Sequence, residues 1–233
     1  MTQLVLIRHG QASFGTANYD RLSEIGERQA RLVGRHLAAS GQRFDVLIAG
    51  TMQRQQRTAE LVNEAFDDAP TIHTEAAFNE YDADAIFAAY TPRVFADNPE
   101  LGAARNQLKT DRRLFQKVFE QVTRHWLAGT PHEHDSCESW LDFKARVQTA
   151  LEKLRGEYPK DARIGLCSSG GPIAISIATA TGAPDAKAIE INWSVYNAAV
   201  AELRSTRDGW RMLAFNDIAA LHAAGDDSLV TFR

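Results

Sequence analysis

The sequence predicts an α/β fold whose sheet is mostly parallel, with a helical insertion. Two observations support this prediction. Short, continuous apolar runs alternate with segments of helical periodicity in the N-terminal part of the chain and again near its C-terminus. Between these parts, residues 76–135 lack such runs and are polar and helical in pattern. Strands that alternate with helices favour right-handed crossovers and hence a parallel sheet.

The N-terminal part begins with an apolar run typical of a strand that is buried on both faces. The expected strands here span residues 4–7, 46–49 and 71–74. A helix is expected after Ser23, where apolar residues recur at helical spacing up to Leu37 and Gly41 follows the end. A second helix is expected from Thr51 to about Ala65. Ser23 and Thr51 are the expected N-caps, because their hydroxyl oxygens can accept hydrogen bonds from first-turn amides.

The C-terminal part is expected to complete the sheet. Its expected strands span residues 163–167, 189–191, 198–203 and 210–215, and its expected helices span residues 140–154 and 173–181, with Pro172 in the first turn of the latter. We predict one domain over residues 1–233, with an insertion of about residues 76–135 that contains a helix within residues 108–127 and forms a cap. About the last fifteen residues are expected to lie at the surface.

The composition is that of an ordinary globular protein, with 233 residues of which 44% are hydrophobic and 24% charged. The net charge of −4 argues against a general nucleic-acid or membrane-surface binder. Cys137 and Cys167 form no CxxC pattern, which favours a reducing compartment, and Cys167 is expected in the core. Neither a targeting stretch nor a membrane-spanning run is found, so we expect a cytoplasmic protein. Nothing in the pattern predicts an oligomeric state.

The first expected strand leads directly into Arg8, His9 and Gly10. In open α/β sheets, ligands bind outside the carboxyl ends of the strands. An imidazole in that place can attack a phosphoryl group, and the planar guanidinium of Arg8 matches phosphate oxygens. Gly10 lets the backbone approach a bound group closely or turn sharply. The tripeptide alone is weak evidence, because a purely structural pair can occupy the end of a strand.

Polar residues also follow other expected strands. Arg54 lies in the first turn of the helix after the second strand, where the helix dipole favours an anion. The run Ser168-Ser169-Gly170-Gly171 is a small-residue turn whose amides could cradle a phosphate. Glu80 follows the third strand, and a carboxylic acid there could protonate a leaving oxygen. A structural or solvated role is the alternative for each of these residues.

Several motifs are more informative as an ordered set than singly. They are Leu6-Ile7-Arg8-His9-Gly10, Leu22-Ser23-x-x-Gly26-x-x-Gln29-Ala30, Arg54-x-x-x-Thr58-Ala59, Asn79-Glu80, Glu138-Ser139-Trp140 and Ser168-x-Gly170-Gly171-Pro172-Ile173. In this order the chain resembles the histidine phosphatase superfamily, which is the phosphoglycerate-mutase-like family, over nearly its whole length. The resemblance implies a three-layer α/β/α sandwich with an all-helical insertion, a small phosphorylated substrate and no cofactor.

The resemblance also implies roles for the candidate catalytic residues. His9 would be the phosphorylated nucleophile, and Arg8 and Arg54 would clamp phosphoryl oxygens. Glu80 would be the general acid and later the base that activates water. The expected substrate-binding residues come from the pocket-lining loop and from the last small-residue turn, and they are Gly10, Gln11, Ser13, Ser169 and Gly170.

One position departs from the family pattern in a way that bears on catalysis. The family usually has Ser-His-Gly-Gly where this chain has Ser168-Ser169-Gly170-Gly171, and that histidine contacts the transferring phosphoryl group. A serine can donate a hydrogen bond but carries no positive charge. Losing one preorganised donor typically costs about 3–4 kcal/mol. The site is therefore expected to be slow, to borrow a donor from the insertion, or to bind phosphate without turnover.

We therefore expect a phosphomonoester hydrolase that works through a phosphohistidine on His9. A phosphoglycerate-mutase-type phosphotransferase and a non-catalytic phosphate-binding member of the family are the alternatives. The mutase is disfavoured because Asp82 and Asp84 follow Glu80, where mutases carry basic groups. A serine hydrolase is a further alternative, but the chain has no Gly-x-Ser-x-Gly motif around Ser168. The run His132-Glu133-His134-Asp135 lacks a zinc-binding spacing, so no metal site is expected.

Overall fold

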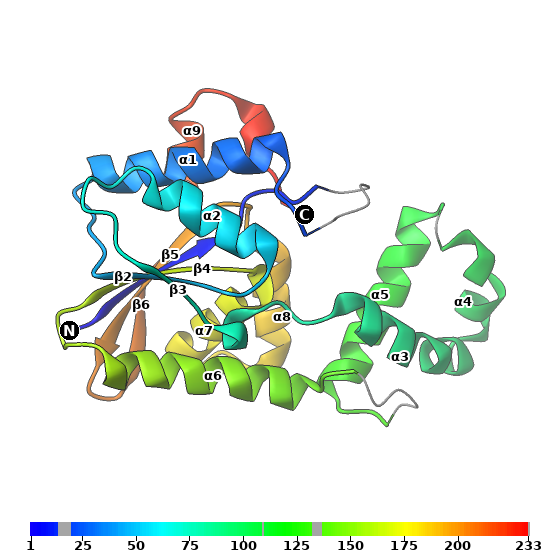
Figure 1. Cartoon of the computed structure of the whole chain (residues 1–233). Helices are drawn as coiled ribbons and strands as arrows, with labels where there is room; N and C mark the ends of the chain where they lie inside the picture. The colour runs from blue at the N-terminus through cyan, green and yellow to red at the C-terminus, as the bar shows by residue number, and fades with distance from the viewer. Residues whose placement is uncertain (14–19, 109, 132–136, 233) are drawn as a thin grey trace. The chain divides into compact units, whose positions relative to one another are not determined.

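The computed structural model describes residues 1–13, 20–108, 110–131 and 137–232, and these form two compact units. The first unit consists of Met1–Glu80 and Arg146–Arg233, and it contains the sheet. The second unit is Tyr81–Ala145. The elements of both units are labelled in Figure 1.

The first unit is built on a mixed, six-stranded sheet. The strands are β1 (Gln3–Arg8), β2 (Val46–Ala49), β3 (Ile72–Thr74), β4 (Arg163–Ser168), β5 (Val200–Thr206) and β6 (Gly209–Asp217), in the order β3-β2-β4-β1-β5-β6. The first four strands run parallel to one another, and β5 and β6 pair antiparallel. The prediction of a mostly parallel α/β sheet is confirmed.

Helices cover both faces of this sheet, which gives the three layers that the resemblance implied (Figure 1). The helices of this unit are α1 (Glu24–Ala39), α2 (Gln53–Asn63), α6 (Trp140–Glu157, from Arg146 on), α7 (Gly170–Thr181), α8 (Asp185–Ser194) and α9 (Ala219–His222), with the short 3-10 turns η1 (Ala76–Phe78) and η3 (Asp227–Leu229). Helices α1, α2 and α9 lie on one face, and α6 and α7 lie on the other.

The core explains why β1 is an unbroken apolar run. Val5 and Ile7 point to one face of the sheet, where they join Val33 and Leu37 of α1 and Val62 of α2 in a fully packed cluster. Successive side chains of a strand point to opposite faces, so the alternate residues of β1 pack in the core on the other face of the sheet. A strand covered on both faces has no place for a polar residue until it ends. That end is where Arg8 and His9 lie.

The predicted caps are right for one helix and wrong for the other. The Ser23 hydroxyl accepts a hydrogen bond from the Gly26 amide and caps α1, as predicted. The N-cap of α2 is Met52, not Thr51. Thr51 is exposed and instead exchanges hydrogen bonds with the Asn79 side chain, through its amide and its hydroxyl, both at 2.7 Å.

Two other predictions for the C-terminal part are wrong. Residues 189–191 lie in α8, not in a strand. The triplet Ile189-Glu190-Ile191 alternates as in a strand, but so short a pattern also fits a helix, in which Ile189 is the buried residue of the three. The last residues are not all at the surface, since Leu221 and Leu229 are fully buried. The Gln29 amide nitrogen donates to the Leu229 carbonyl at 2.7 Å, and this bond anchors the C-terminal segment to α1.

The second unit is helical where the structure describes it. It contains α3 (Ala83–Asp97), α4 (Pro99–Ala103), η2 (Arg105–Gln107), α5 (Arg112–Leu127) and the start of α6. The stripe that predicted a helix within residues 108–127 is buried in α5, and it consists of Leu114, Val118, Val122 and Trp126. Trp126 packs on Tyr81 and Trp140, with ring centroids 4.8 and 5.1 Å apart. The single-domain organisation with a cap stays a prediction.

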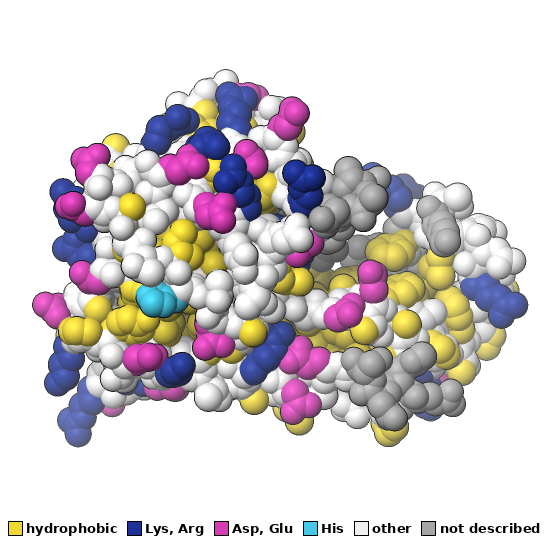
Figure 2. Space-filling model, viewed as in Figure 1, with side chains coloured by type: hydrophobic (Ala, Val, Ile, Leu, Met, Phe, Trp, Pro, Cys, Tyr) yellow, Lys and Arg dark blue, Asp and Glu magenta, His cyan; other side chains and the backbone are white. Residues whose placement is uncertain are grey.

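The surface mixes charges of both signs. On the face seen in Figure 2, lysine and arginine side chains lie among aspartates and glutamates. Ion pairs such as Arg57–Glu27, at 3.0 Å, and Arg28–Asp226, at 2.6 Å, join elements of the first unit. Within the described part of the chain, no helix is long and apolar enough to cross a membrane.

Candidate active site

The candidate site lies at the carboxyl edge of the sheet, within the first unit. Strand β1 ends at Arg8, which pairs in register with Ser168 at the end of β4. The His9 amide continues this ladder by donating to the Ser168 carbonyl at 2.8 Å. His9 and Ser169 therefore occupy neighbouring positions just beyond two central, parallel strands.

The hydrogen bonds of His9 define the state of its imidazole. Nδ1 lies 2.7 Å from the Gly10 carbonyl, which can only accept, so Nδ1 carries the proton. Arg54 Nε lies 3.2 Å from Nε2 and can only donate, so Nε2 presents its lone pair. The ring is consequently the neutral Nδ1–H tautomer, which is the form that can act as a nucleophile through Nε2.

The surroundings of His9 favour this neutral form. Burial lowers the pKa of His9 well below its ordinary value of 6.5, and the positive charges of Arg8 and Arg54 lower it further, against a smaller opposing effect of the Gly10 hydrogen bond. His9 is only 6% exposed, so little water reaches the ring to stabilise an imidazolium. The nucleophilic form of His9 therefore persists into mildly acidic solution.

This lowered pKa predicts a loss of stability in acid. Above pH 6.5, His9 is neutral in both the folded and the unfolded chain. As the pH falls below 6.5, the unfolded chain binds a proton that the folded chain refuses, so the free energy of unfolding falls until the pH passes the folded pKa. We expect His9→Asn to remove this part of the pH dependence in urea denaturation series. His36→Asn, on the exposed side of α1, is the control, and equal pH slopes for wild type and His9→Asn would contradict the prediction.

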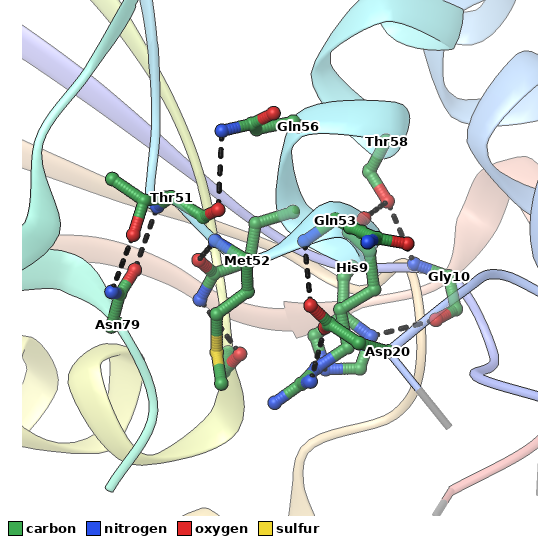
Figure 3. Close-up of polar contacts among 12 residues, drawn as sticks. His9, Gly10, Asp20, Thr51, Met52, Gln53, Gln56, Thr58 and Asn79 are labelled. Carbon is green, nitrogen blue, oxygen red and sulfur yellow. Dashed lines mark hydrogen bonds and ion pairs between the residues drawn. The ribbon is translucent and has the colours of Figure 1, made fainter. Parts of the chain in front are cut away.

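Arg54 is held by the carboxylate of Asp20, which was not among the candidate site residues. Arg54 Nη1 donates to Asp20 Oδ1 at 2.6 Å, and the Gln53 amide at the start of α2 donates to Asp20 Oδ2 at 2.9 Å (Figure 3). Asp20 therefore neutralises both the guanidinium and the positive end of the helix. The helix start was predicted to attract an anion, and in the structure a side chain of the same protein fills that role.

Arg8 is also buried at the site, at 8% exposure. Its Nη1 donates to the Val195 carbonyl, which follows α8. A guanidinium offers five N–H donors in a planar fork that matches the oxygens of a phosphate. Arg8 and Arg54 both lie close enough to His9 to act on its charge, which places two guanidinium groups around one imidazole.

Glu80 contacts the turn that the sequence predicted to cradle a phosphate. Its Oε2 accepts a hydrogen bond from the Gly171 amide at 3.0 Å, in the first turn of α7. Gly170 begins the same helix, and a β-carbon on it would lie 2.3 Å from Asn192 Oδ1. Glu80, the predicted acid, is therefore hydrogen-bonded to the turn that was predicted to bind a phosphate.

The residues after His9 are fixed by the starts of α1 and α2. The Gly10 amide lies 3.2 Å from the Thr58 hydroxyl oxygen, to which it donates (Figure 3). The Ser23 hydroxyl donates to Gln11 Oε1 at 2.8 Å, and the Ser13 hydroxyl donates to the Leu22 carbonyl at 3.0 Å. The candidate binding residues Gln11 and Ser13 therefore hold the loop in place, and a role in binding substrate stays a prediction for both.

Ser169 is fully buried beside His9, and its partner was not foreseen from the sequence. Gln55 Nε2 donates to the Ser169 hydroxyl oxygen at 2.8 Å. Ser168 donates its hydroxyl to the Phe78 carbonyl at 2.7 Å. Among the described residues, no histidine contacts either hydroxyl in the way that the base of a serine hydrolase would.

No group of three or more histidine, cysteine or acidic side chains arranged to hold a metal ion is found in the part of the chain that the structure describes. The run from His132 to Asp135 lies outside the described residues. Cys167 is fully buried in the sheet, and this burial strongly raises the pKa of its thiol. Cys167 is thus a core residue, as the sequence predicted.

Comparison with known proteins identifies the family to which the chain belongs. The family model described as the histidine phosphatase superfamily (branch 1) matches residues 4–116 and 101–218. The chain belongs to the histidine phosphatase superfamily. A curated relative within it, the 2,3-bisphosphoglycerate-dependent phosphoglycerate mutase of Methylobacterium sp. (strain 4-46), is 42% identical over 87 residues. That match covers 34% of this chain and 41% of the mutase, so the chain spans about two fifths of the length of this relative.

Solved structures share the fold over nearly the whole chain. A phosphoglycerate mutase from Bacillus anthracis str. Sterne superposes with a TM-score of 0.67 and 18% identity, covering 97% of each chain. A mycobacterial glucosyl-3-phosphoglycerate phosphatase superposes with a TM-score of 0.61 and 21% identity, covering 92% of this chain and 98% of the phosphatase. Solved structures with this fold thus include both a mutase and a phosphatase.

Proposed function

We propose that the protein hydrolyses phosphomonoesters through a phosphohistidine formed on Nε2 of His9. The observation that supports this most directly is the contact between Nε2 and Arg54 Nε, at 3.2 Å. A neutral imidazole that presents a lone pair beside a buried guanidinium suits an attack on an anionic phosphoryl group. Family membership and the phosphatases among the structural relatives support the same reaction class.

The reaction would proceed in two balanced steps. In the first, the Nε2 lone pair forms a bond to phosphorus while the ester P–O bond breaks, and the leaving oxygen takes a proton from the Glu80 carboxyl. In the second, Glu80 removes a proton from water, the hydroxide attacks phosphorus, and the P–N bond breaks to release inorganic phosphate. Arg8 and Arg54 would neutralise charge on the phosphoryl oxygens in both steps. The Gly171 amide would hold Glu80 in place through Oε2.

A phosphoglycerate-mutase-type phosphotransferase is the second candidate, because mutases are among the curated relatives. A mutase must bind a substrate that carries a carboxylate as well as a phosphate. The chain places Asp82 and Asp84 just after Glu80, and these acidic groups oppose such a substrate. Asp82 already serves α3 as its N-cap, since Asp82 Oδ1 accepts from the Ala85 amide at 2.9 Å. The phosphatase is therefore the preferred assignment.

The proposal is tested by trapping the intermediate. The full chain is mixed with a radiolabelled phosphomonoester and quenched, and we expect an acid-labile, base-stable label on His9 together with steady release of inorganic phosphate. A phosphoglycerate substrate is assayed in parallel. Efficient interconversion of its phosphate positions without net release would establish the mutase instead. Phosphate binding with neither label nor turnover would identify a non-catalytic member of the family.

A further inference from the structure

Ser169 and Gln55 form a buried polar pair next to His9. Both side chains are fully buried, and Gln55 Nε2 lies 2.8 Å from the Ser169 hydroxyl oxygen. Ser169 is the N-cap residue of α7, yet its side chain makes no capping bond to that helix. Gln55 follows Arg54 in the first turn of α2. The pair therefore links the helix that carries Arg54 to the strand end beside His9.

The donors and acceptors of this pair fix the direction of the Ser169 hydroxyl. The Gln55 amide nitrogen donates to the Ser169 oxygen and to the Phe78 carbonyl, at 2.8 and 3.1 Å, so both of its hydrogens are used. An amide nitrogen cannot accept, so the Ser169 hydrogen points away from Gln55. Among the described residues, none accepts that hydrogen. A buried hydroxyl whose hydrogen has no acceptor costs free energy. A ligand that accepts this hydrogen bond would remove the cost.

We propose that Gln55 is a positioning residue that orients the Ser169 hydroxyl to donate a hydrogen bond to the phosphoryl group on His9. This inference rests on the proposed function of the site. In the family pattern, a histidine at the position of Ser169 contacts that group. In this chain the Ser169 hydroxyl supplies a neutral hydrogen-bond donor at the same end of β4. The Gln55 side chain occupies the space between α2 and that strand end.

The pair also predicts how replacing Ser169 by histidine would change the rate. An imidazole that follows the Ser169 side chain would run into the Gln55 amide, only 2.8 Å away, and overpacking of a buried site is destabilising. Shortening residue 55 to alanine would make room for the ring. Ser169→His alone should therefore fail to raise the rate, whereas Gln55→Ala with Ser169→His should be faster than Gln55→Ala alone.

A double-mutant cycle tests the proposal on the full chain. We expect Ser169→Ala to lower kcat by roughly 10- to 100-fold. We expect Gln55→Leu to lower kcat less, and the double variant to match Ser169→Ala, because Gln55 acts only through Ser169. Gln56→Leu is the matched control, since Gln56 lies next on α2 and its side-chain amide donates to the Thr51 carbonyl, outside the buried pair. Thermal unfolding of each variant confirms that the folded protein is being assayed.

The outcomes separate this inference from the proposed function. If His9→Ala abolishes turnover but Ser169→Ala and Gln55→Leu keep wild-type kcat, the pair is only structural and the inference is wrong. Losses in kcat that add across the cycle would also overturn it. If the wild type shows no turnover, the proposed function fails, and titration with inorganic phosphate replaces kcat as the readout. Weaker phosphate binding by Ser169→Ala and Gln55→Leu, but not Gln56→Leu, would then support the pair, and unchanged affinity would refute it.

Discussion

Replacing His9 by alanine is expected to lower kcat for phosphomonoester hydrolysis by roughly 10⁴- to 10⁶-fold, as removal of a covalent nucleophile does in other enzymes. The physical reason is that Nε2 is the atom that would form the bond to phosphorus, and it is already unprotonated beside Arg54. Neither guanidinium can replace it, because guanidinium groups have no lone pair to donate. The measurement is phosphate release under single-turnover and steady-state conditions.

Two other histidines provide the control for this experiment. His36 on α1 and His73 on β3 are exposed, and alanine at either position should leave kcat close to that of the wild type. Removing a buried ring also costs stability, so the assay is made well below the unfolding temperature of the variant. Activity within tenfold of the wild type for a folded His9→Ala protein would exclude a phosphohistidine mechanism.

Replacing Gly10 by alanine is expected to destabilise the fold by about 3 kcal/mol or more. A β-carbon on Gly10 would lie 2.2 Å from the Gly26 carbonyl oxygen, and a β-carbon on Gly26 would lie 2.1 Å from the Gln11 carbonyl oxygen. Both obstacles are backbone atoms, so no side chain can rotate away. The loop after β1 would have to separate from α1, and His9 would shift with it. Urea denaturation measures the loss, which corresponds to a fall in Tm of roughly 6–12 °C.

The control for the glycine experiment is Gly156→Ala. Gly156 lies in α6, it is exposed, and a β-carbon there would meet nothing within 4 Å. Gly156 lies in the last turn of α6, one residue before Glu157, so alanine there is expected to stabilise by less than the roughly 0.5–1 kcal/mol that is typical of a helix interior. The two substitutions add the same methyl group, so opposite signs would isolate the close contact between Gly10 and Gly26. Equal effects from both would refute the steric explanation.

The sheet and the main helices could be predicted because their signals are local. An unbroken apolar run such as β1 must be covered on both faces, and the four-residue spacing in α5 marks a buried stripe. The prediction failed at residues 189–191, since a triplet with Glu190 between two isoleucines is too short to distinguish a strand from a turn of helix. The buried Leu229 was missed because its partner, Gln29, lies 200 residues away in the sequence.

The candidate site could be predicted only in its strand-end residues. His9, Arg54 and Ser169 stand directly after strands or in the first turn of a helix, so topology brings them to one edge. Asp20 and Gln55 were not foreseen, because nothing in a loop aspartate or a helical glutamine identifies a partner across the fold. The need for a glycine at position 10 was predicted, but for a close approach to a bound group or a sharp turn, whereas the structure shows a close approach to α1.

Each of the two helices that begin at the site already holds an internal counter-ion. Asp20 takes the Gln53 amide and Arg54 at the start of α2, and Glu80 takes the Gly171 amide at the start of α7. If a phosphate binds Arg54, as we propose, it replaces Asp20 as the partner of that guanidinium and so exchanges one anion for another, while Glu80 stays on the Gly171 amide. We therefore expect a dianion to compete with Asp20 for Arg54 better than chloride or a simple carboxylate does, because its higher charge is attracted more strongly. Under the proposed function, the contact between Asp20 and Arg54 would therefore make the site selective for a doubly charged group.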